Sequence, residues 1–433
     1  MVRSQEKIYN RFILSFSMSN YLLYGGGTNL AVLNHQKLYN ANRVSYICIV
    51  PYLIHGKKFD RFIDFWSLII DGEQMGVLRT FRLIQVIKRF KDEGVQLIAI
   101  HIHHWKETDL KCFQQIMNAI GGSVYMFIHD YYTVCCNFTL LRQGNFCGYG
   151  QLSDEKCGSC EFYSEALKKR AEYEKIWYSL KNRLQFVFPS EVAQRVWINA
   201  YPQFKHLCHV TPHQCCMGVY NGNIGETKDK FNIAFVGSRE RYKGWDIFIE
   251  LYKRKRQDSR FVWFYLGTDE IGIEEIHHIY VDNRIDPMSM VKALRWNNID
   301  IAVLWSLCKE TYSYVYYECF SANVFVLTNS NSGNIAFQVK KNKNGMVVKS
   351  EEELFHVVDE KIVEIINTFK TGDIRGPEIL STNQQILNYI MPSEIKERKV
   401  VKKLKCDPIE YGLFLLERFA IKLRKMKKCF RLK

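Results

Sequence analysis

The sequence predicts an α/β protein in which two doubly wound domains face each other across a cleft. Two observations predict this fold: short apolar runs alternate with longer helical segments, and the alternation restarts after about residue 225. The length of 433 residues fits two or three domains. With 47% hydrophobic and 14% aromatic residues, the chain has enough material for a core, which excludes disordered and low-complexity classes.

The predicted strands are short runs that are apolar throughout. They lie at residues 12–16, 45–50, 95–101, 124–129 and 185–188, and then at 231–236, 261–266, 300–305 and 324–328. Strands of this kind are typical of parallel sheets that are covered by helices on both faces. The order therefore predicts one doubly wound sheet in each half.

The domain boundaries follow from this pattern. We expect an N-terminal domain over 1–217, a linker rich in Gly and Asn over 218–230, and a second domain over 231–380. C-terminal helices with a basic tail follow over 381–433. Open α/β sheets bind ligands at the carboxyl ends of their strands, so the loops after strands are where functional residues are expected.

Most of the excess positive charge lies in the C-terminal tail. Residues 398–433 hold +10 of the formal net charge of +15. Apolar residues at helical spacing and the cations around them are Leu413, Leu416, Ala420, Leu423 and Phe430 with Arg418, Lys422, Lys425 and Lys428. This pattern predicts a basic amphipathic helix, which either lies on an anionic membrane or packs on the protein with its basic face in solvent. No nucleic-acid motif accompanies it, so nucleic acid is not an expected partner.

The sequence shows no recognisable targeting signal, and we expect a cytoplasmic protein. No apolar run approaches the ~18 residues that a membrane-spanning helix needs. Arg3, Lys7 and Arg11 precede a short apolar segment, but no small-residue cleavage site follows it. The 14 cysteines therefore indicate cytosolic thiols or metal ligands. We expect a soluble cytoplasmic protein, peripheral on the inner membrane face if the tail binds lipid.

Two loops that follow predicted strands are suited to bind phosphate. Residues 25–27 are three glycines that precede a helical segment, so free backbone N–H groups and a helix N-terminus could meet an anion. Residues 237–244 carry Arg239, Arg241 and Lys243 within five positions at a strand-to-helix turn. The second loop lacks the Walker pattern, which excludes a P-loop.

Two further strand ends carry carboxylates and histidines. Glu310 and Glu318 are eight residues apart, which places one at a loop-to-helix junction and the other about two turns along the helix. His129 and Asp130 end the run 124–129. The His-rich run 101–104 lies one strand earlier, but only two of its imidazoles share a face, one short of the usual three for zinc.

Together these loops resemble those of retaining glycosyltransferases with the GT-B fold, in the large family numbered four. The family's Gly-x-Arg…Lys-Gly loop appears at 237–244, and its Glu-x7-Glu element appears as Glu310 to Glu318. The run 310–314 is similar to that of bacterial polysaccharide glycosyltransferases, and the His runs look like the N-domain motifs. The resemblance covers roughly residues 12–350 and implies two Rossmann-like domains.

The resemblance also implies roles for the donor site, a nucleotide-diphosphate sugar being the donor. His129 would lie against the transferred sugar near the bond that breaks, and Glu310 would bind that sugar's hydroxyls. The remaining donor-binding residues would be Gly26, Gly27, Arg239, Lys243, Ser313, Tyr314 and Glu318, with Arg241 a competing choice for the cation. Ser313 stands where the family has Gly, and Asn323 stands in place of a Gly in a turn.

Metal chemistry is predicted at one place only. No Asp-x-Asp pair occurs in the chain, which favours transfer without a catalytic metal. Cys135, Cys147, Cys157 and Cys160 follow His129 at a spacing that could close a structural zinc site, or they are free thiols.

The leading hypothesis is a hexosyltransferase-type enzyme that extends a surface polysaccharide, lipopolysaccharide or other glycolipid acceptor. The alternatives are another GT-B nucleotide-sugar enzyme of the 2-epimerase type and a non-catalytic module that binds lipid or nucleic acid.

Overall fold

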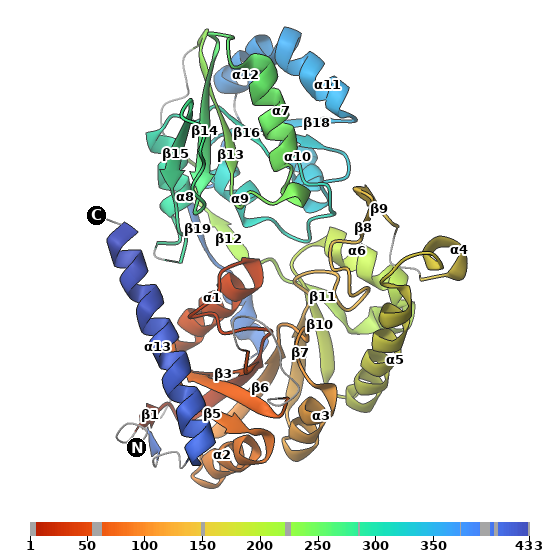
Figure 1. Ribbon diagram of the computed structural model, residues 1–433, viewed down its shortest axis with the longest axis vertical. Coiled ribbons are helices and arrows are strands. Elements are labelled where there is room, and N and C mark those ends of the chain that lie inside the picture. The colour runs from red at the N-terminus through yellow and green to blue at the C-terminus, as the bar shows by residue number, and fades with distance from the viewer. Residues whose placement is uncertain are drawn as a thin grey trace.

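The computed structural model describes residues 6–53, 63–148, 152–220, 227–284, 286–372, 374–389, 399–401 and 406–431. Two α/β domains are stacked along the long axis, and the C-terminal helix runs beside the N-terminal domain (Figure 1). Several positions that the sequence assigned to the linker and tail, among them Asn221, Gly222 and Arg398, lie outside the described residues.

The N-terminal domain contains an eight-stranded sheet in the order β11-β10-β7-β6-β2-β3-β4-β5. Its strands are β2 (Arg11–Phe16), β3 (Ser45–Pro51), β4 (Phe65–Ile70), β5 (Glu73–Arg79), β6 (Gln96–Ile102), β7 (Ser123–Phe127), β10 (Leu184–Phe188) and β11 (Cys208–Val210). Each strand predicted in this half is present within two residues of its expected bounds. The strands are parallel from β11 through β3, as the unbroken apolar runs predicted.

One edge of this sheet is antiparallel and was not predicted. Strands β4 and β5 form a hairpin that extends the sheet in the antiparallel sense, and no strand was predicted there. Its turn is Asp71-Gly72, with φ of 50° and 85°. Asp-Gly between two apolar runs is the strongest short-range hairpin signal, because both turn positions need positive φ.

Helices cover this sheet on both faces. They are α1 (Gly27–Ala41), α2 (Thr80–Asp92), α3 (Leu110–Ala119), α5 (Tyr163–Leu180) and α6 (Glu191–Ala200). A short helix, α4 (Asp154–Cys157), lies in the excursion that carries the four predicted zinc ligands, from Cys135 to Cys160. Asp109 and Ser190 cap α3 and α6 by accepting a backbone N–H of the first turn. The small hairpin β8 (Leu141–Arg142) and β9 (Asn145–Phe146) lies in the same excursion as α4.

The C-terminal domain contains a six-stranded parallel sheet in the order β15-β14-β13-β16-β17-β18. The strands are β13 (Phe231–Val236), β14 (Phe261–Gly267), β15 (Ile276–Tyr280), β16 (Ile301–Val303), β17 (Phe325–Asn329) and β18 (Gly345–Val348). Around them lie α7 (Trp245–Lys255), α8 (Ser289–Trp296), α9 (Tyr314–Ser321), α10 (Asn334–Asn342), α11 (Glu351–His356) and α12 (Ile362–Thr371). The strand order reverses between β13 and β16, which opens a crevice at their carboxyl ends.

The chain crosses between the domains twice. Strand β12 (Gln214–Met217) leads out of the N-terminal domain and pairs antiparallel with β19 (Ile379–Thr382), which brings the chain back. Beyond β19, Ile386 is buried in the N-terminal domain beside Tyr39. The predicted C-terminal segment therefore packs on the first domain.

The C-terminal helix α13 (Pro408–Arg431) docks on β5 through a face that the sequence pattern did not indicate. Its buried residues are Glu410, Leu413, Phe414, Glu417 and Ile421. The Glu417 carboxylate accepts hydrogen bonds from Asn20 at 2.8 Å, Ser67 at 2.6 Å and Gln74 at 2.9 Å. Because the docked face carries two carboxylates, the sequence pattern marks it as polar. In the folded protein, both carboxylates have hydrogen-bond partners.

The apolar stripe predicted for this helix lies mostly on its outer side. Leu416 is 63% exposed and Leu423 is 41% exposed, while Leu413 is buried. The side chain of Phe430 lies outside the described residues, as do those of Lys425 and Lys428.

Candidate active site

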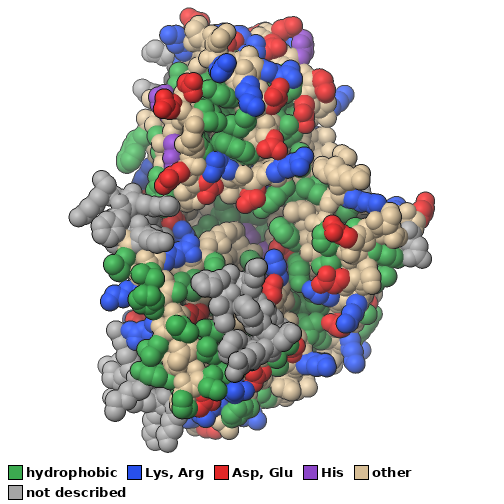
Figure 2. Space-filling model, viewed as in Figure 1, with side chains coloured by type: hydrophobic (Ala, Val, Ile, Leu, Met, Phe, Trp, Pro, Cys, Tyr) green, Lys and Arg blue, Asp and Glu red, His purple; other side chains and the backbone are tan. Residues whose placement is uncertain are grey.

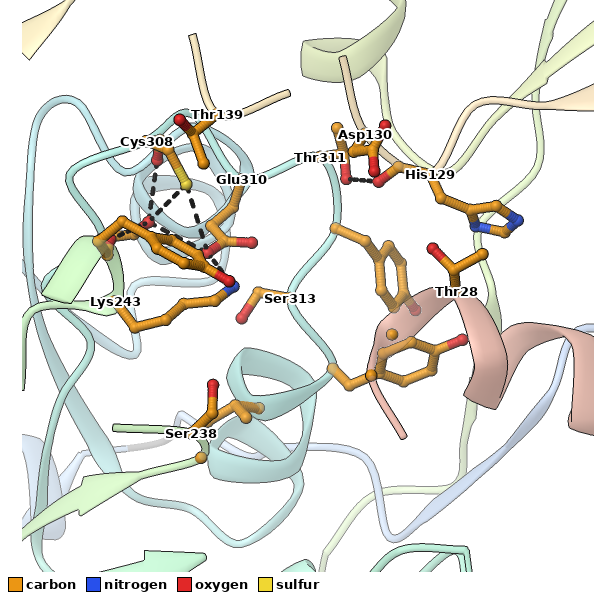
Figure 3. Close-up of a pocket in the computed structure, with 18 of the residues that line it drawn as sticks. Thr28, His129, Asp130, Thr139, Ser238, Lys243, Cys308, Glu310, Thr311 and Ser313 are labelled. Carbon is orange, nitrogen blue, oxygen red and sulfur yellow. Dashed lines mark hydrogen bonds and ion pairs between the residues drawn. The ribbon is translucent and has the colours of Figure 1, made fainter. Parts of the chain in front are cut away.

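A cavity of about 490 Å³ lies between the two domains, and loops after strands of both sheets line it. From the N-terminal domain come Gly26, Gly27, Thr28, His129 and Asp130; from the C-terminal domain come Ser238, Lys243, Glu310, Thr311, Ser313 and Tyr314 (Figure 3). Seven of the fourteen predicted site residues lie outside this cavity lining: the four cysteines and three residues assigned to the donor, namely Arg239, Arg241 and Glu318.

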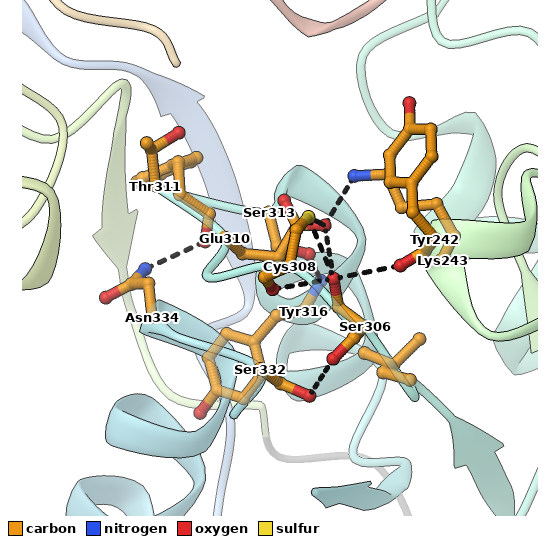
Figure 4. A network of polar contacts seen from close by, with 12 residues as sticks. Tyr242, Lys243, Ser306, Cys308, Glu310, Thr311, Ser313, Tyr316, Ser332 and Asn334 are labelled. Atoms are coloured by element: carbon orange, nitrogen blue, oxygen red, sulfur yellow. Dashed lines mark hydrogen bonds and ion pairs between the residues drawn. The ribbon is translucent and has the colours of Figure 1, made fainter. Parts of the chain in front are cut away.

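Lys243 and Glu310 form an ion pair in the cavity. Lys243 Nζ lies 2.5 Å from Glu310 Oε1, and Ser306 Oγ donates to the same oxygen at 3.1 Å (Figure 4). Burial disfavours the charged lysine, but the Glu310 carboxylate outweighs this and raises the pKa of Lys243. The two residues to which the resemblance assigned the diphosphate and the sugar are thus partners of each other in this structure.

Thr311 joins the two domains at this point. Its Oγ1 donates to the His129 carbonyl oxygen at 2.5 Å, and its own carbonyl accepts from Ser190 Oγ at 2.6 Å. Thr311 is not among the predicted site residues, although its position beside Glu310 was a usable signal. These contacts hold the loop after β16 against the end of β7.

The N-terminus of α9 faces the cavity through a strained turn. Ser313 has φ of 71°, the conformation that the resemblance assigns to a Gly, and its hydroxyl accepts the Tyr316 N–H at 3.4 Å. Asn323, at the other end of α9, has φ of 58°, as expected for a residue that tolerates the left-handed region. The turn is therefore kept without glycine.

The N-terminus of α1 approaches from the opposite side. Gly26 is its N-cap, with φ of 101°, and no acidic residue lies in the first turn. A 15-residue helix that ends at the cavity presents free N–H groups and the positive end of its dipole.

The three donor-site residues outside the cavity lining have other partners. Arg241 is 85% exposed at its side chain and pairs with Asp246 at 3.4 Å. Arg239 lies 5.5 Å from the Trp245 ring centroid, and its Nε is 4.0 Å from Asp269. Arg239 and Arg241 were the competing candidates for the arginine that binds the diphosphate, and neither lines the cavity.

Glu318 lies behind the cavity in the second turn of α9. Asn283 donates to its Oε1 at 2.6 Å, whereas Oε2 is buried without a hydrogen-bond partner. Burial raises the pKa of this carboxyl to about 8. An unpartnered buried carboxyl oxygen of this kind can form a hydrogen bond with a ligand hydroxyl.

His129 forms part of a histidine cluster in the N-terminal wall. Its ring stacks on His213 with centroids 5.1 Å apart, and its Nε2 is 2.8 Å from His103 Nδ1. Burial, reinforced by neighbouring histidines, lowers the pKa of His129 well below its usual value. The adjacent Asp130 accepts from His104 at 3.1 Å, which lowers the pKa of Asp130 against the opposing effect of burial.

A third histidine completes the set that the sequence left one ligand short. Among the described residues, His35 on α1 joins His101 and His103, and their ligand atoms lie within 4.8 Å of one another. No sequence pattern links position 35 to the run 101–104, because they meet only when α1 packs on the sheet.

The four predicted zinc ligands surround a separate small cavity of about 30 Å³. All four are free thiols, and the turn from Cys157 to Cys160 is closed by a backbone hydrogen bond of 2.7 Å. Burial raises the pKa of Cys135 to about 12. In the described part of the chain, only the histidine group meets the 4.8 Å spacing of ligand atoms.

Comparison with solved structures identifies the fold. A sucrose-phosphate synthase from Thermosynechococcus elongatus matches with a TM-score of 0.53 and 12% identity, over 83% of this chain and 92% of that chain. The chain has the GT-B fold. Staphylococcus aureus TarM (TM-score 0.49, 9% identity, 83% and 94% covered) and Anabaena HepE (0.48, 12%, 83% and 92%) also match. No protein-family model and no curated protein sequence matches.

Proposed function

We propose that this GT-B protein is a retaining glycosyltransferase of the family-four type that moves a sugar from a nucleotide-diphosphate donor to a glycan or lipid-linked acceptor. The observation that carries the proposal is the single cavity into which loops after strands of both domains bring Lys243, Glu310 and His129. Two helix N-termini, those of α1 and α9, end at the same cavity. The shared fold with a sucrose-phosphate synthase agrees with it.

The proposed donor position follows from charge. The diphosphate lies between Lys243 and the helix N-termini, because these groups favour an anion. The transferred sugar lies between Glu310 and His129, and the ribose lies toward Glu318, whose Oε2 is buried behind the cavity without a hydrogen-bond partner. Donor binding thus separates Lys243 from Glu310 and gives each a ligand group in exchange.

The proposed transfer breaks the bond between the sugar and the diphosphate. Negative charge develops on the leaving phosphate, and a fixed cation with aligned N–H groups stabilises this charge more in the transition state than in the ground state. These groups supply the stabilisation that a catalytic metal provides in other transferases, so we propose metal-independent transfer.

Exchanging Glu310 tests the arrangement. We expect Glu310→Gln to lose sugar transfer but to bind the free nucleoside diphosphate about fivefold more tightly, because the carboxylate no longer competes for Lys243. Calorimetry with a panel of nucleoside diphosphates measures the affinity, and nucleotide release from sugar donors measures turnover. Glu250→Gln on the exposed face of α7 is the matched control. Retained transfer by Glu310→Gln would refute the assignment.

The same assays separate the alternatives. A 2-epimerase converts its donor without an acceptor and yields an isomeric sugar, whereas a transferase yields a glycoside only when an acceptor is present. A non-catalytic module binds without releasing nucleotide from any donor.

We also propose that the outer face of α13 binds an anionic membrane surface. Exposed large apolar residues line this face, namely Leu415, Leu416, Phe419, Leu423 and Met426. Figure 2 shows hydrophobic and basic side chains together along this side of the N-terminal domain. Arg418 and Lys422 are exposed between the apolar residues, and each cation near an anionic bilayer contributes about 1 kcal/mol. In the described residues, no helix is both long and apolar enough to cross a bilayer.

Vesicle flotation tests this surface. We expect binding to vesicles with phosphatidylglycerol but not to neutral phosphatidylcholine vesicles, and we expect Leu416→Ser with Phe419→Ser to abolish it. Trp296→Ser is the matched control, since this residue is 80% exposed but lies on α8. Equal binding by both variants would exclude α13 as the contact.

Structural zinc at the cysteines remains a proposal. The four thiols line one cavity, and metal binding would draw their sulfur atoms together and order the excursion. Metal analysis of the purified chain and of Cys157→Ser is the test; a zinc-free wild type would remove the idea.

A further inference from the structure

A continuous line of hydrogen bonds runs from the core of the N-terminal sheet to His129. Tyr46 on β3 donates from its hydroxyl to Ser15 Oγ at 2.9 Å. The same tyrosine oxygen lies 2.9 Å from His103 Nε2, and His103 Nδ1 lies 2.8 Å from His129 Nε2. Ser15, Tyr46 and His103 are all buried.

Two arrangements are open along this line, set by whether the Tyr46 hydroxyl donates to Ser15 or to His103 Nε2. With the Tyr46 proton in the bond to Ser15, the tyrosine oxygen accepts from His103, which then carries its proton on Nε2. A neutral imidazole has one ring proton, which makes His103 Nδ1 an acceptor. His129 must then hold its own proton on Nε2 and donate it to His103.

The neutrality of both rings has a physical cause. His103 stacks on Phe127 at 4.9 Å and on His129 at 5.1 Å, in a wall without a carboxylate partner for either ring. Burial lowers the pKa of His103 and of His129 well below the usual value. The other titratable groups around them are His35, His101, His104, His213 and Asp130.

We propose that Tyr46 and His103 are positioning residues that lock His129 in the Nε2–H tautomer, so that its unprotonated Nδ1 accepts a hydroxyl of the bound sugar. His129 Nδ1 is buried without a hydrogen-bond partner, and the His129 residue lines the cavity. This inference rests on the proposed function for the identity of the ligand. The tautomer itself does not depend on it.

A metal at His35, His101 and His103 is the competing use of the same cluster. His35 Nδ1 and His101 Nδ1 are buried without partners, which suits ligation. Both nitrogens of His103 are already engaged, however, so a metal would displace either Tyr46 or His129. The hydrogen bonds favour the tautomer lock, and a bound metal becomes an outcome of the test.

Nitrogen NMR of the full chain with ¹⁵N-labelled histidine tests the lock directly. Two-bond proton–nitrogen correlations distinguish the tautomers, and the His129 signals are assigned by their loss in His129→Gln. We expect the Nε2–H tautomer for His129 and His103 in the wild type. The Nδ1–H tautomer at either ring, or an equivalent of tightly bound metal, would overturn the proposal whether or not the chain transfers sugar.

Tyr46→Phe removes the hydroxyl that directs the chain while keeping the ring. We expect mixed tautomers at His129 and about a tenfold lower kcat/KM for the sugar donor. Affinity for the nucleoside diphosphate should not change, because that molecule lacks the transferred sugar. The matched control is Tyr39→Phe, because Tyr39 stacks on Tyr46 but directs its hydroxyl to His101 and Ile386.

Two variants at position 103 separate positioning from packing. Asn places an acceptor oxygen close to the place of Nδ1, so His103→Asn should keep the His129 tautomer and most of the donor kcat/KM. His103→Leu should lose both. Equal kinetics for the two variants, or a tautomer that does not change in Tyr46→Phe, would contradict the lock.

Discussion

The two walls of the cavity handle charge in opposite ways. The C-terminal wall places an ion pair, Lys243 with Glu310, in the cavity and a third ionisable group, Glu318, behind it. The N-terminal wall presents a helix N-terminus and stacked histidines, with Lys106 beside them, and its carboxylate, Asp130, already accepts from His104. The comparison teaches that the C-terminal wall meets a ligand with an ion pair, whereas the N-terminal wall meets it mainly with backbone N–H groups and imidazole rings.

The largest expected difference between the walls concerns packing. Gly244 has φ of 88°, and a Cβ added there would lie 2.2 Å from the Trp305 carbonyl oxygen, whereas a Cβ at Gly26 would meet nothing within 4 Å. We expect Gly244→Ala to cost roughly 4 kcal/mol or more and Gly26→Ala about 1–3 kcal/mol from backbone strain alone. Urea unfolding measures both, and equal costs would contradict the contrast.

Removing the positive charge of Lys243 from the C-terminal wall should strongly reduce turnover. Lys243→Met is expected to lower turnover by about 10²–10³-fold, because no other side-chain cation from the loop 237–244 lines the cavity. Arg241→Met, two residues earlier and directed to solvent, should change turnover by less than about threefold. Nucleotide release at saturating donor compares the variants; a larger loss for Arg241→Met would reverse the assignment.

The carboxyls of Glu318 and Asp130 should change the free energy of unfolding in opposite directions as the pH rises. The folded state holds the Glu318 proton up to about pH 8, whereas the ordinary value is 4.5, so the unfolding free energy falls as pH rises between these values. We expect Glu318→Gln, which keeps an acceptor for Asn283, to raise Tm increasingly over this window.

Asp130 behaves in the reverse way. Its pKa is lowered from 3.8, so its stabilisation is present above that pH and is lost as pH falls through the folded value. Asp130→Asn should therefore lower Tm at neutral pH. Thermal unfolding from about pH 2 to 9 covers the windows of both variants, and a Tm shift for Glu318→Gln that does not change with pH would contradict the burial argument.

The smallest expected effect concerns the positive φ of Ser313, at the N-terminus of α9 in the C-terminal wall. Ser313→Gly relieves a positive φ that costs about 1 kcal/mol and loses a cap worth a few tenths, so a net gain of about 0.5 kcal/mol is expected. Asn323→Gly is the control, with a smaller gain, because Asn tolerates its φ of 58°. Urea unfolding compares the two variants with the wild type.

The sequence by itself determined most of the parallel strands, and seven of the ten residues assigned to the donor site line the cavity. Apolar runs can be read locally because burial on both faces leaves no alternation, and each functional loop directly follows such a run. The β4–β5 hairpin was also readable from Asp71-Gly72, since turn chemistry is local. The ends of α9 kept their positive φ at Ser313 and Asn323 despite the absence of glycine.

Only the tertiary structure decided which groups meet. The pairing of Lys243 with Glu310, the approach of His35 to His101 and His103, and the burial of Glu417 join residues far apart in sequence. Each depends on how helices and loops pack on the sheets, because hydrogen bonds and ion pairs need contact within about 3–4 Å. Periodicity cannot report such distances, so the face on which α13 docks and the partner of each charged side chain were settled by packing.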